Sequence, residues 1–232
     1  MKHSLSAVQA VILDMDGVLV DTEPIHIRAF CELLDEMGVD YEAEYVNGFV
    51  GFSIDDNVRR INRDFFPDSQ LDIEECVEKR DRMYLDILRA TALHPLPGIR
   101  ELTEVCRKKG LQLALASSSD RNQIQAILQN LKENGFDLKP YLNVVVSGDE
   151  VEHRKPDSQI YRLTLQRLGC PPEQALAIED SEAGVESAKA AGVLCAALKN
   201  PYITDHRLKK ADFLIDRINE VATALNSNPG KK

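Results

Sequence analysis

The chain has 232 residues, of which 44% are hydrophobic and 28% are charged; this composition is typical of a globular protein and excludes wholesale disorder and a fibrous coil. At about 150 residues per domain, the length predicts one domain with a sizeable insertion, or two small domains. The formal net charge of −10 argues against a nucleic acid or an anionic membrane surface as a partner.

Signals for targeting, disulfides and zinc are sparse. No apolar run reaches the roughly 18 residues of a membrane span, and Asp14 interrupts the first apolar stretch. We therefore expect a cytoplasmic protein without a signal peptide. The cysteines are scattered and contain no Cys-x-x-Cys pair, which indicates reduced thiols rather than a disulfide framework or a zinc site.

The first predicted element is a buried strand over residues 7–13, a short apolar run that ends at Asp14. A helix is expected to begin at residues 22–24, where a hydroxyl, an acid and a proline follow one another, and to stop at Gly38. Residues 41–93 then show no convincing strand pattern.

Two further helices are predicted in this stretch, over residues 54–61 and 76–88, with a turn at residues 68–70. The sequence His-Pro-Leu-Pro-Gly at residues 94–98 then punctuates the chain strongly. We therefore expect a small α-helical domain over residues 22–94, inserted into a larger domain formed by residues 1–21 and 95–232.

After residue 98 the predicted elements alternate. Helices are expected over residues 99–109, 122–134, 157–168, 181–191 and 220–225, and strands over residues 111–116, 143–147, 175–178, 193–198 and 211–215. Alternating strands and helices imply right-handed crossover units, and thus a parallel sheet covered by helices on both faces. The expected fold class is α/β with a Rossmann-like core, followed by a loose tail over residues 226–232.

Polar side chains follow several of these strands directly. They are Asp14, Asp16, Ser117, Glu179 and Asp180, and Lys155 lies in a loop before a predicted helix. In open parallel sheets, ligands bind outside the carboxyl ends of the strands, so these residues are expected to converge at one edge. A single aspartate after a strand is more often a turn residue or a helix cap than a catalyst. Four such positions in one chain are poorly explained by coincidence.

Four carboxylates at one edge of the sheet need positive charge to offset their mutual repulsion. Two like charges about 4 Å apart repel by on the order of 4 kcal/mol at an effective dielectric constant near 20. A divalent cation removes this penalty, and Mg²⁺ suits oxygen ligands together with a substrate phosphate. Ser117 offers a hydroxyl donor and Lys155 a positive charge suited to phosphate. The residue types therefore fit phosphoryl transfer through an aspartyl-phosphate.

Four segments resemble, in order, the motifs of the haloacid dehalogenase superfamily. They are Asp14–Thr22 (DMDGVLVDT), Leu113–Ser117 (LALAS), Lys155–Asp157 (KPD) and Ile178–Ser181 (IEDS). The helical insert after the first motif is similar to the cap of the phosphatase and β-phosphoglucomutase branch. The acid at Asp16 favours phosphate-ester chemistry, because the dehalogenases and phosphonatases of this superfamily lack an acid there.

The resemblance implies roles for the core residues. Asp14 would be the phosphorylated nucleophile, and Asp16 the general acid and then the base for water. Mg²⁺ would be held by Asp14, the backbone carbonyl of Asp16 and Asp180, with Glu179 as a ligand or an anchor. The residues expected to hold the phosphate are Ser117, Ser118 and Lys155.

The resemblance also implies candidate substrate residues in the cap, which are Thr22, His26, Gly51, Phe52 and Ser53. His26 would help to gate the acid, or it is an ordinary surface histidine of the first cap helix. In the mutase, a lysine precedes the equivalent glycine and an arginine follows the serine, whereas this chain has Val50 and Ile54. These departures favour hydrolysis over mutase activity.

The sequence thus predicts a Mg²⁺-dependent phosphatase that acts as a monomer on a small phosphorylated metabolite, a phosphomonoester of the sugar phosphate type. The first alternative is a β-phosphoglucomutase-like phosphosugar mutase. An alternative of another class is a non-catalytic domain that binds phosphosugars and regulates a partner, against which the Asp14 and Asp16 pair speaks.

Overall fold

The computed structural model describes residues 5–68, 71–201 and 205–227. The chain divides into two compact units, a core unit of residues 1–21 and 93–232 and a helical unit of residues 22–92. The sequence placed the end of the insert at residue 94. Leu93 already belongs to the core unit, where its backbone N–H donates to Oδ1 of Asn130 at 2.9 Å.

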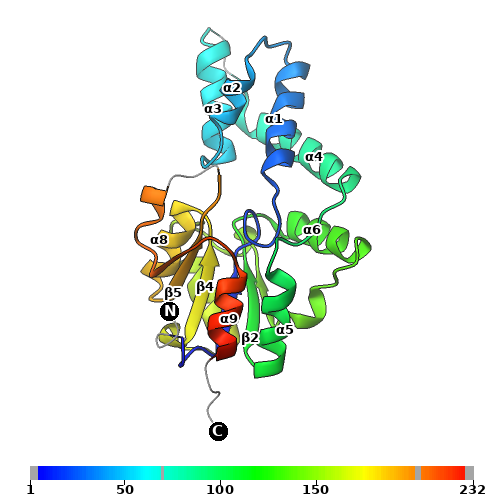
Figure 1. Cartoon of the computed structure of the whole chain (residues 1–232). Helices are drawn as coiled ribbons and strands as arrows, with labels where there is room; N and C mark the ends of the chain where they lie inside the picture. Colours follow the sequence, from blue (N-terminus) through cyan, green and yellow to red (C-terminus); the bar gives the residue numbers. More distant parts are fainter. Residues whose placement is uncertain (1–4, 69–70, 202–204, 228–232) are drawn as a thin grey trace. The chain divides into compact units, whose positions relative to one another are not determined.

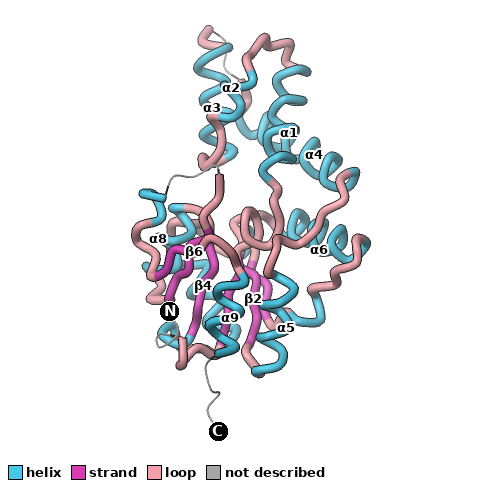
Figure 2. Tube along the Cα trace, viewed as in Figure 1, coloured by secondary structure: helices cyan, strands magenta, loops and turns pink. Residues whose placement is uncertain are grey.

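The core unit contains a six-stranded, all-parallel sheet in the order β3-β2-β1-β4-β5-β6 (Figures 1 and 2). The strands are β1 (Ala10–Leu13), β2 (Gln112–Ala116), β3 (Val144–Val146), β4 (Ala175–Glu179), β5 (Leu194–Leu198) and β6 (Phe213–Ile215). Leu13 at the end of β1 pairs with Leu115 of β2 and with Ile178 of β4. The carboxyl ends of these three strands are therefore level to within one residue, and the residues around these ends lie side by side.

Helices cover both faces of the sheet, as the sequence predicts. They are α5 (Ile99–Lys109), α6 (Arg121–Glu133), α7 (Gln159–Leu168), α8 (Glu182–Ala190) and α9 (Asn219–Ser227), with 3₁₀ turns at residues 139–141, 148–150, 172–174 and 205–208. Ile12 packs in one buried cluster with Ile160 of α7 and Val185 of α8. Its neighbours Val11 and Leu13 point to the other face because strand side chains alternate, and there α5 and α9 contact each other (Figure 1).

The helical unit consists of α1 (Glu23–Glu36), α2 (Ala43–Asn47), α3 (Ile54–Phe65) and α4 (Ile73–Ala90). The three helices predicted here are confirmed; α2 was missed because five residues are too few to show a helical repeat. Ser53 and Asp72 cap α3 and α4, since their side chains accept the N–H of Asp56 and of Glu75 at 3.1 Å. Of the turn predicted at residues 68–70, residues 69 and 70 lie outside the described residues.

Several predicted boundaries were wrong by one to four residues. The helix predicted from Asp157 begins at Gln159, because the Asp157 carboxylate accepts the Gln159 N–H at 2.8 Å and holds a turn ahead of it. Glu179, predicted to follow a strand, is the last residue of β4. The predicted tail begins inside α9, which extends to Ser227, and residues 228–232 lie outside the described residues. Within the described ranges, no helix combines the length and apolar character that membrane crossing requires.

Candidate active site

Three carboxylates converge at the carboxyl ends of β1 and β4. Asp14 directly follows β1, Glu179 ends β4 and Asp180 follows it. Each contributes an oxygen, and these oxygens all lie within 4.8 Å of one another. All three residues are buried, and Glu179 is fully excluded from solvent. The level ends of the two paired strands place these acids together, as the sequence predicts.

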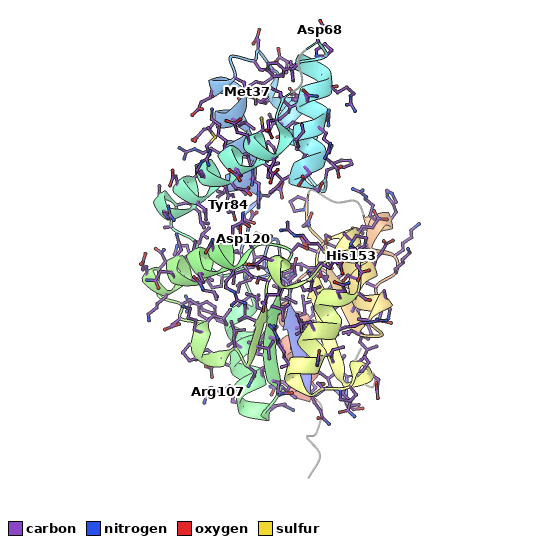
Figure 3. The ribbon with its side chains drawn as sticks, turned by 180° about the vertical axis from the view of Figure 1, so that it is seen from behind. Met37, Asp68, Tyr84, Arg107, Asp120 and His153 are labelled. Carbon is purple, nitrogen blue, oxygen red and sulfur yellow. The ribbon has the colours of Figure 1, made fainter. Side chains whose placement is uncertain are left out.

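Lys155 reaches into this cluster from the loop that precedes α7, where His153 also lies (Figure 3). Its Nζ donates to Asp14 Oδ1 at 2.8 Å, to Glu179 Oε1 at 2.6 Å and to the backbone carbonyl of Ala116 at 3.0 Å. Only 5% of the lysine side chain is exposed. The ammonium group is therefore fixed at the sheet edge between residues that lie more than 100 positions apart in the sequence.

The electrostatics of the cluster favour an additional cation. Burial and the neighbouring Glu179 carboxylate raise the pKa of Asp14 to about 7, although Lys155 opposes the shift. Burial, Asp14 and Glu179 likewise raise the pKa of Asp180. Burial lowers the pKa of Lys155, but the two carboxylates outweigh it and raise this pKa above its usual value. The cluster thus destabilises its own negative charges.

These residues fit a divalent cation. Three ionised carboxylates against one ammonium leave a net charge of −2, which such an ion neutralises. Mg²⁺ holds oxygens at about 2.0–2.1 Å, so opposite ligands of one ion are about 4 Å apart. The carboxylate oxygens of the cluster lie within 4.8 Å of one another, which is close to this separation between ligands. Gly17 leaves room beside Asp180, because a Cβ on it would lie 1.9 Å from Asp180 Oδ2.

The carboxylate of Asp16 does not belong to the three-carboxylate cluster. It is half-buried in the loop after β1, and its Oδ2 accepts a hydrogen bond from Ser119 Oγ at 2.9 Å. Ser117 is buried at the end of β2, and its backbone N–H donates to Val146 at 3.1 Å. Ser118 follows it in the loop that leads to α6. The structure therefore brings Asp14, Lys155, Glu179 and Asp180 together, and the β2–α6 loop contacts Asp16.

Sequence reasoning missed two partners of the cluster. The hydroxyl of Tyr161 donates to Glu179 Oε1 at 2.5 Å, and Nδ2 of Asn200 donates to Asp180 Oδ2 at 2.8 Å. Asn200 lies two residues after β5, so its place beyond a strand end was a usable signal. Tyr161 sits among apolar residues of α7 and resembled a core residue. Because Glu179 Oε1 accepts from both Lys155 and Tyr161, the geometry favours Glu179 as the anchor of Lys155.

The predicted cap residues belong to the helical unit, which is described by itself. Thr22 precedes α1, and Nδ1 of His26 contacts Nη2 of Arg80. The His26 ring stacks on Tyr84 of α4, which Figure 3 labels, at a centroid distance of 4.4 Å. In the loop before α3, Gly51 has a φ of +84°, Phe52 is 59% exposed, and Ser53 caps the helix. Their contact with substrate stays a prediction.

The chain is similar to known proteins over most of its length. Residues 11–198 match the model of the haloacid dehalogenase-like hydrolase family. A phosphorylated carbohydrates phosphatase of Thermotoga maritima is 35% identical over 187 residues, which cover 80% of this chain and 82% of the relative. Hexitol phosphatase B of Escherichia coli is 29% identical, with 91% and 93% covered.

Among solved structures, a mutant of CbbY from Rhodobacter sphaeroides in complex with xylulose-1,5-bisphosphate superposes with a TM-score of 0.79 at 27% identity. The match covers 94% of this chain and 99% of that one. The family match spans the strands that carry Asp14, Ser117 and Glu179 as well as Lys155 between them. The chain belongs to the haloacid dehalogenase-like hydrolases.

Proposed function

We propose that this protein is a Mg²⁺-dependent phosphatase that hydrolyses a small phosphomonoester, a sugar phosphate, through an aspartyl-phosphate on Asp14. One observation carries the proposal: the Lys155 ammonium bridges Asp14 and Glu179 within a buried cluster of three carboxylates. A nucleophilic carboxylate beside a fixed positive charge is the arrangement that attack on a dianionic phosphate requires.

In the first step, an Asp14 carboxylate oxygen attacks phosphorus, and the bond between phosphorus and the ester oxygen breaks. Asp16 donates a proton to the departing oxygen, which leaves as the free hydroxyl of the sugar. Lys155 neutralises charge on the phosphoryl oxygens, and Ser117 and Ser118 hold that group from the loop after β2. A bound Mg²⁺, held by Asp14, Asp180 and the carbonyl of Asp16, would offset the charge of the carboxylates and the phosphate.

In the second step, Asp16, now ionised, accepts a proton from water as the water attacks the phosphoryl group on Asp14. The bond between phosphorus and the Asp14 oxygen breaks, inorganic phosphate leaves, and the free carboxylate returns. Ser119 holds the Asp16 carboxylate at 2.9 Å, in the loop that also carries the phosphate-binding serines. The same carboxyl group thus serves as acid and as base in turn.

The sugar phosphate assignment is supported by two relatives named as phosphatases of phosphorylated carbohydrates and of hexitol phosphates. The test is phosphate release from a panel of phosphorylated sugars, sugar alcohols and short acids. We expect release that EDTA abolishes and Mg²⁺ restores, and that Asp14→Asn removes. Undiminished release after exhaustive chelation would contradict the proposed mechanism.

Mutase activity is separated from hydrolysis by one incubation. The protein is mixed with β-glucose 1-phosphate and a trace of the glucose 1,6-bisphosphate. Hydrolysis predicts free phosphate and glucose. Formation of glucose 6-phosphate without free phosphate would replace the phosphatase proposal by a mutase.

A further inference from the structure

The proposed acid, Asp16, is fixed by a residue outside the four motifs. Ser119 Oγ donates to Asp16 Oδ2 at 2.9 Å, and the two residues are 103 positions apart in the sequence. A carboxylate on a half-buried loop can adopt several rotamers. The hydrogen bond from the Ser119 hydroxyl to Oδ2 restricts the Asp16 side chain to one of them, whichever protonation state the carboxyl group has.

Ser119 is itself held on both sides of its peptide unit. Its N–H donates to Ser117 Oγ at 3.1 Å, and its carbonyl accepts the N–H of Gly148 at 2.8 Å. A Cβ on Gly148 would lie 2.1 Å from the carbonyl oxygen of Ser118. The turn after β3 therefore packs backbone against backbone on the loop after β2, and only glycine permits this approach.

Glu150 fixes the turn after β3. Its Oε1 accepts the N–H and the hydroxyl of Ser147, both at 3.0 Å, and lies 2.7 Å from Nη2 of Arg121. Its Oε2 accepts from Arg167 at 2.7 Å. Arg121 begins α6 and Arg167 lies near the end of α7. One carboxylate thus ties the turn to the two helices on either side of the site loops.

We propose that Ser119 is a positioning residue for Asp16, held in place by the turn of residues 147–150. The hydroxyl aims the Asp16 carboxyl group at the ester oxygen and at the attacking water, without touching phosphate itself. The inference rests on the proposed phosphatase function. It assigns to Ser119 a role in proton transfer rather than in phosphate binding. Kinetic measurements distinguish these two roles.

The test compares the parent protein with Ser119→Ala and Ser119→Thr on the best sugar phosphate and on p-nitrophenyl phosphate. Ser227→Ala is the matched control, because that serine donates its hydroxyl to Thr223 on the exposed face of α9. Nitrophenolate leaves without needing a proton, so its initial burst reports the attack of Asp14 alone. Thermal unfolding of each variant checks that it is folded.

For Ser119→Ala we expect kcat on the sugar phosphate to fall at least about tenfold, while KM and the nitrophenolate burst rate change less than about twofold. Ser119→Thr keeps the hydroxyl and should recover most of kcat. An unchanged kcat in Ser119→Ala, or equal losses in KM, kcat and burst rate, would overturn the inference. If the parent releases no phosphate from any substrate, the proposed function fails first, and this inference with it.

Discussion

Lys155 of the core unit and Arg80 of the helical unit are both buried cations, but their surroundings differ. The Lys155 side chain is 5% exposed; burial lowers its pKa, but contact with two buried carboxylates outweighs this and raises the pKa. Arg80 is fully buried, and burial lowers its pKa. Its guanidinium pairs with Asp81 at 3.0 Å and lies over the rings of Phe30 and Tyr84, 4.7 and 5.1 Å from their centroids.

A buried charge contributes differently to the two units. Arg80 is balanced locally by one partly exposed acid and two aromatic faces, so it stabilises the packing of α1 against α4. Lys155 is surrounded by more negative charge than it can neutralise. An excess of buried negative charge costs stability and indicates a site that binds a further cation.

The largest expected effect on stability follows removal of the Lys155 charge. Lys155→Met leaves Asp14 and Glu179 buried without their shared donor, and we expect the free energy of unfolding to fall by about 3–5 kcal/mol in metal-free buffer at neutral pH. Urea unfolding followed by circular dichroism measures this change. A loss below about 1 kcal/mol would show that the lysine is not needed to neutralise the cluster.

Titration of Asp14 should produce the second-largest effect on stability. The pKa of Asp14 is 3.8 in the unfolded chain and about 7 in the folded protein, because of burial and Glu179. The folded state therefore binds more protons between pH 4 and 7, and this group lowers stability as the pH rises through that window, by on the order of 3 kcal/mol.

The measurement is the difference in unfolding free energy between the parent and Asp14→Asn across pH 4 to 7, without metal. Asp14→Asn should become the more stable of the two as the pH rises, and saturating Mg²⁺ should remove much of that advantage by binding the parent. A difference that does not change with pH would contradict the assigned shift.

The smallest effect is expected in the helical unit. Arg80→Met keeps an apolar stem against Phe30 and Tyr84, and Asp81 stays partly solvated, so we expect a loss of about 1–2 kcal/mol. Differential scanning calorimetry of this variant beside Lys155→Met tests the contrast directly. If the two variants lost equal stability, the two buried cations would not differ in the way described above.

Those site residues whose position depends only on the backbone of the sheet could be predicted from the sequence. Asp14, Glu179 and Asp180 meet because β1 and β4 are parallel neighbours in level register, and strand ends are visible as polar residues after apolar runs. Tyr161 and Arg80 were not predicted to act as they do. Their contacts depend on helices packing against elements far away in the sequence, and a tyrosine among apolar residues or an arginine on a helix shows nothing of this.

The contact between Ser119 and Asp16 was missed for a similar reason. Both residues follow strands that pair, but the direction of a loop side chain depends on the turn after β3, which comes later in the sequence. The same limit applies to the short helix α2, whose five residues carry no repeat.

The proposed hydrolysis depends on phosphorylation of Asp14, and acid quenching captures that intermediate. The protein is mixed with substrate and Mg²⁺, quenched within milliseconds, digested with pepsin at low pH and analysed by mass spectrometry. We expect one phosphoryl group on the peptide that contains Asp14, absent after EDTA treatment and in Asp14→Asn. Substrate turnover with an unmodified Asp14 peptide, or with the phosphoryl group on another residue, would rule out Asp14 as the nucleophile.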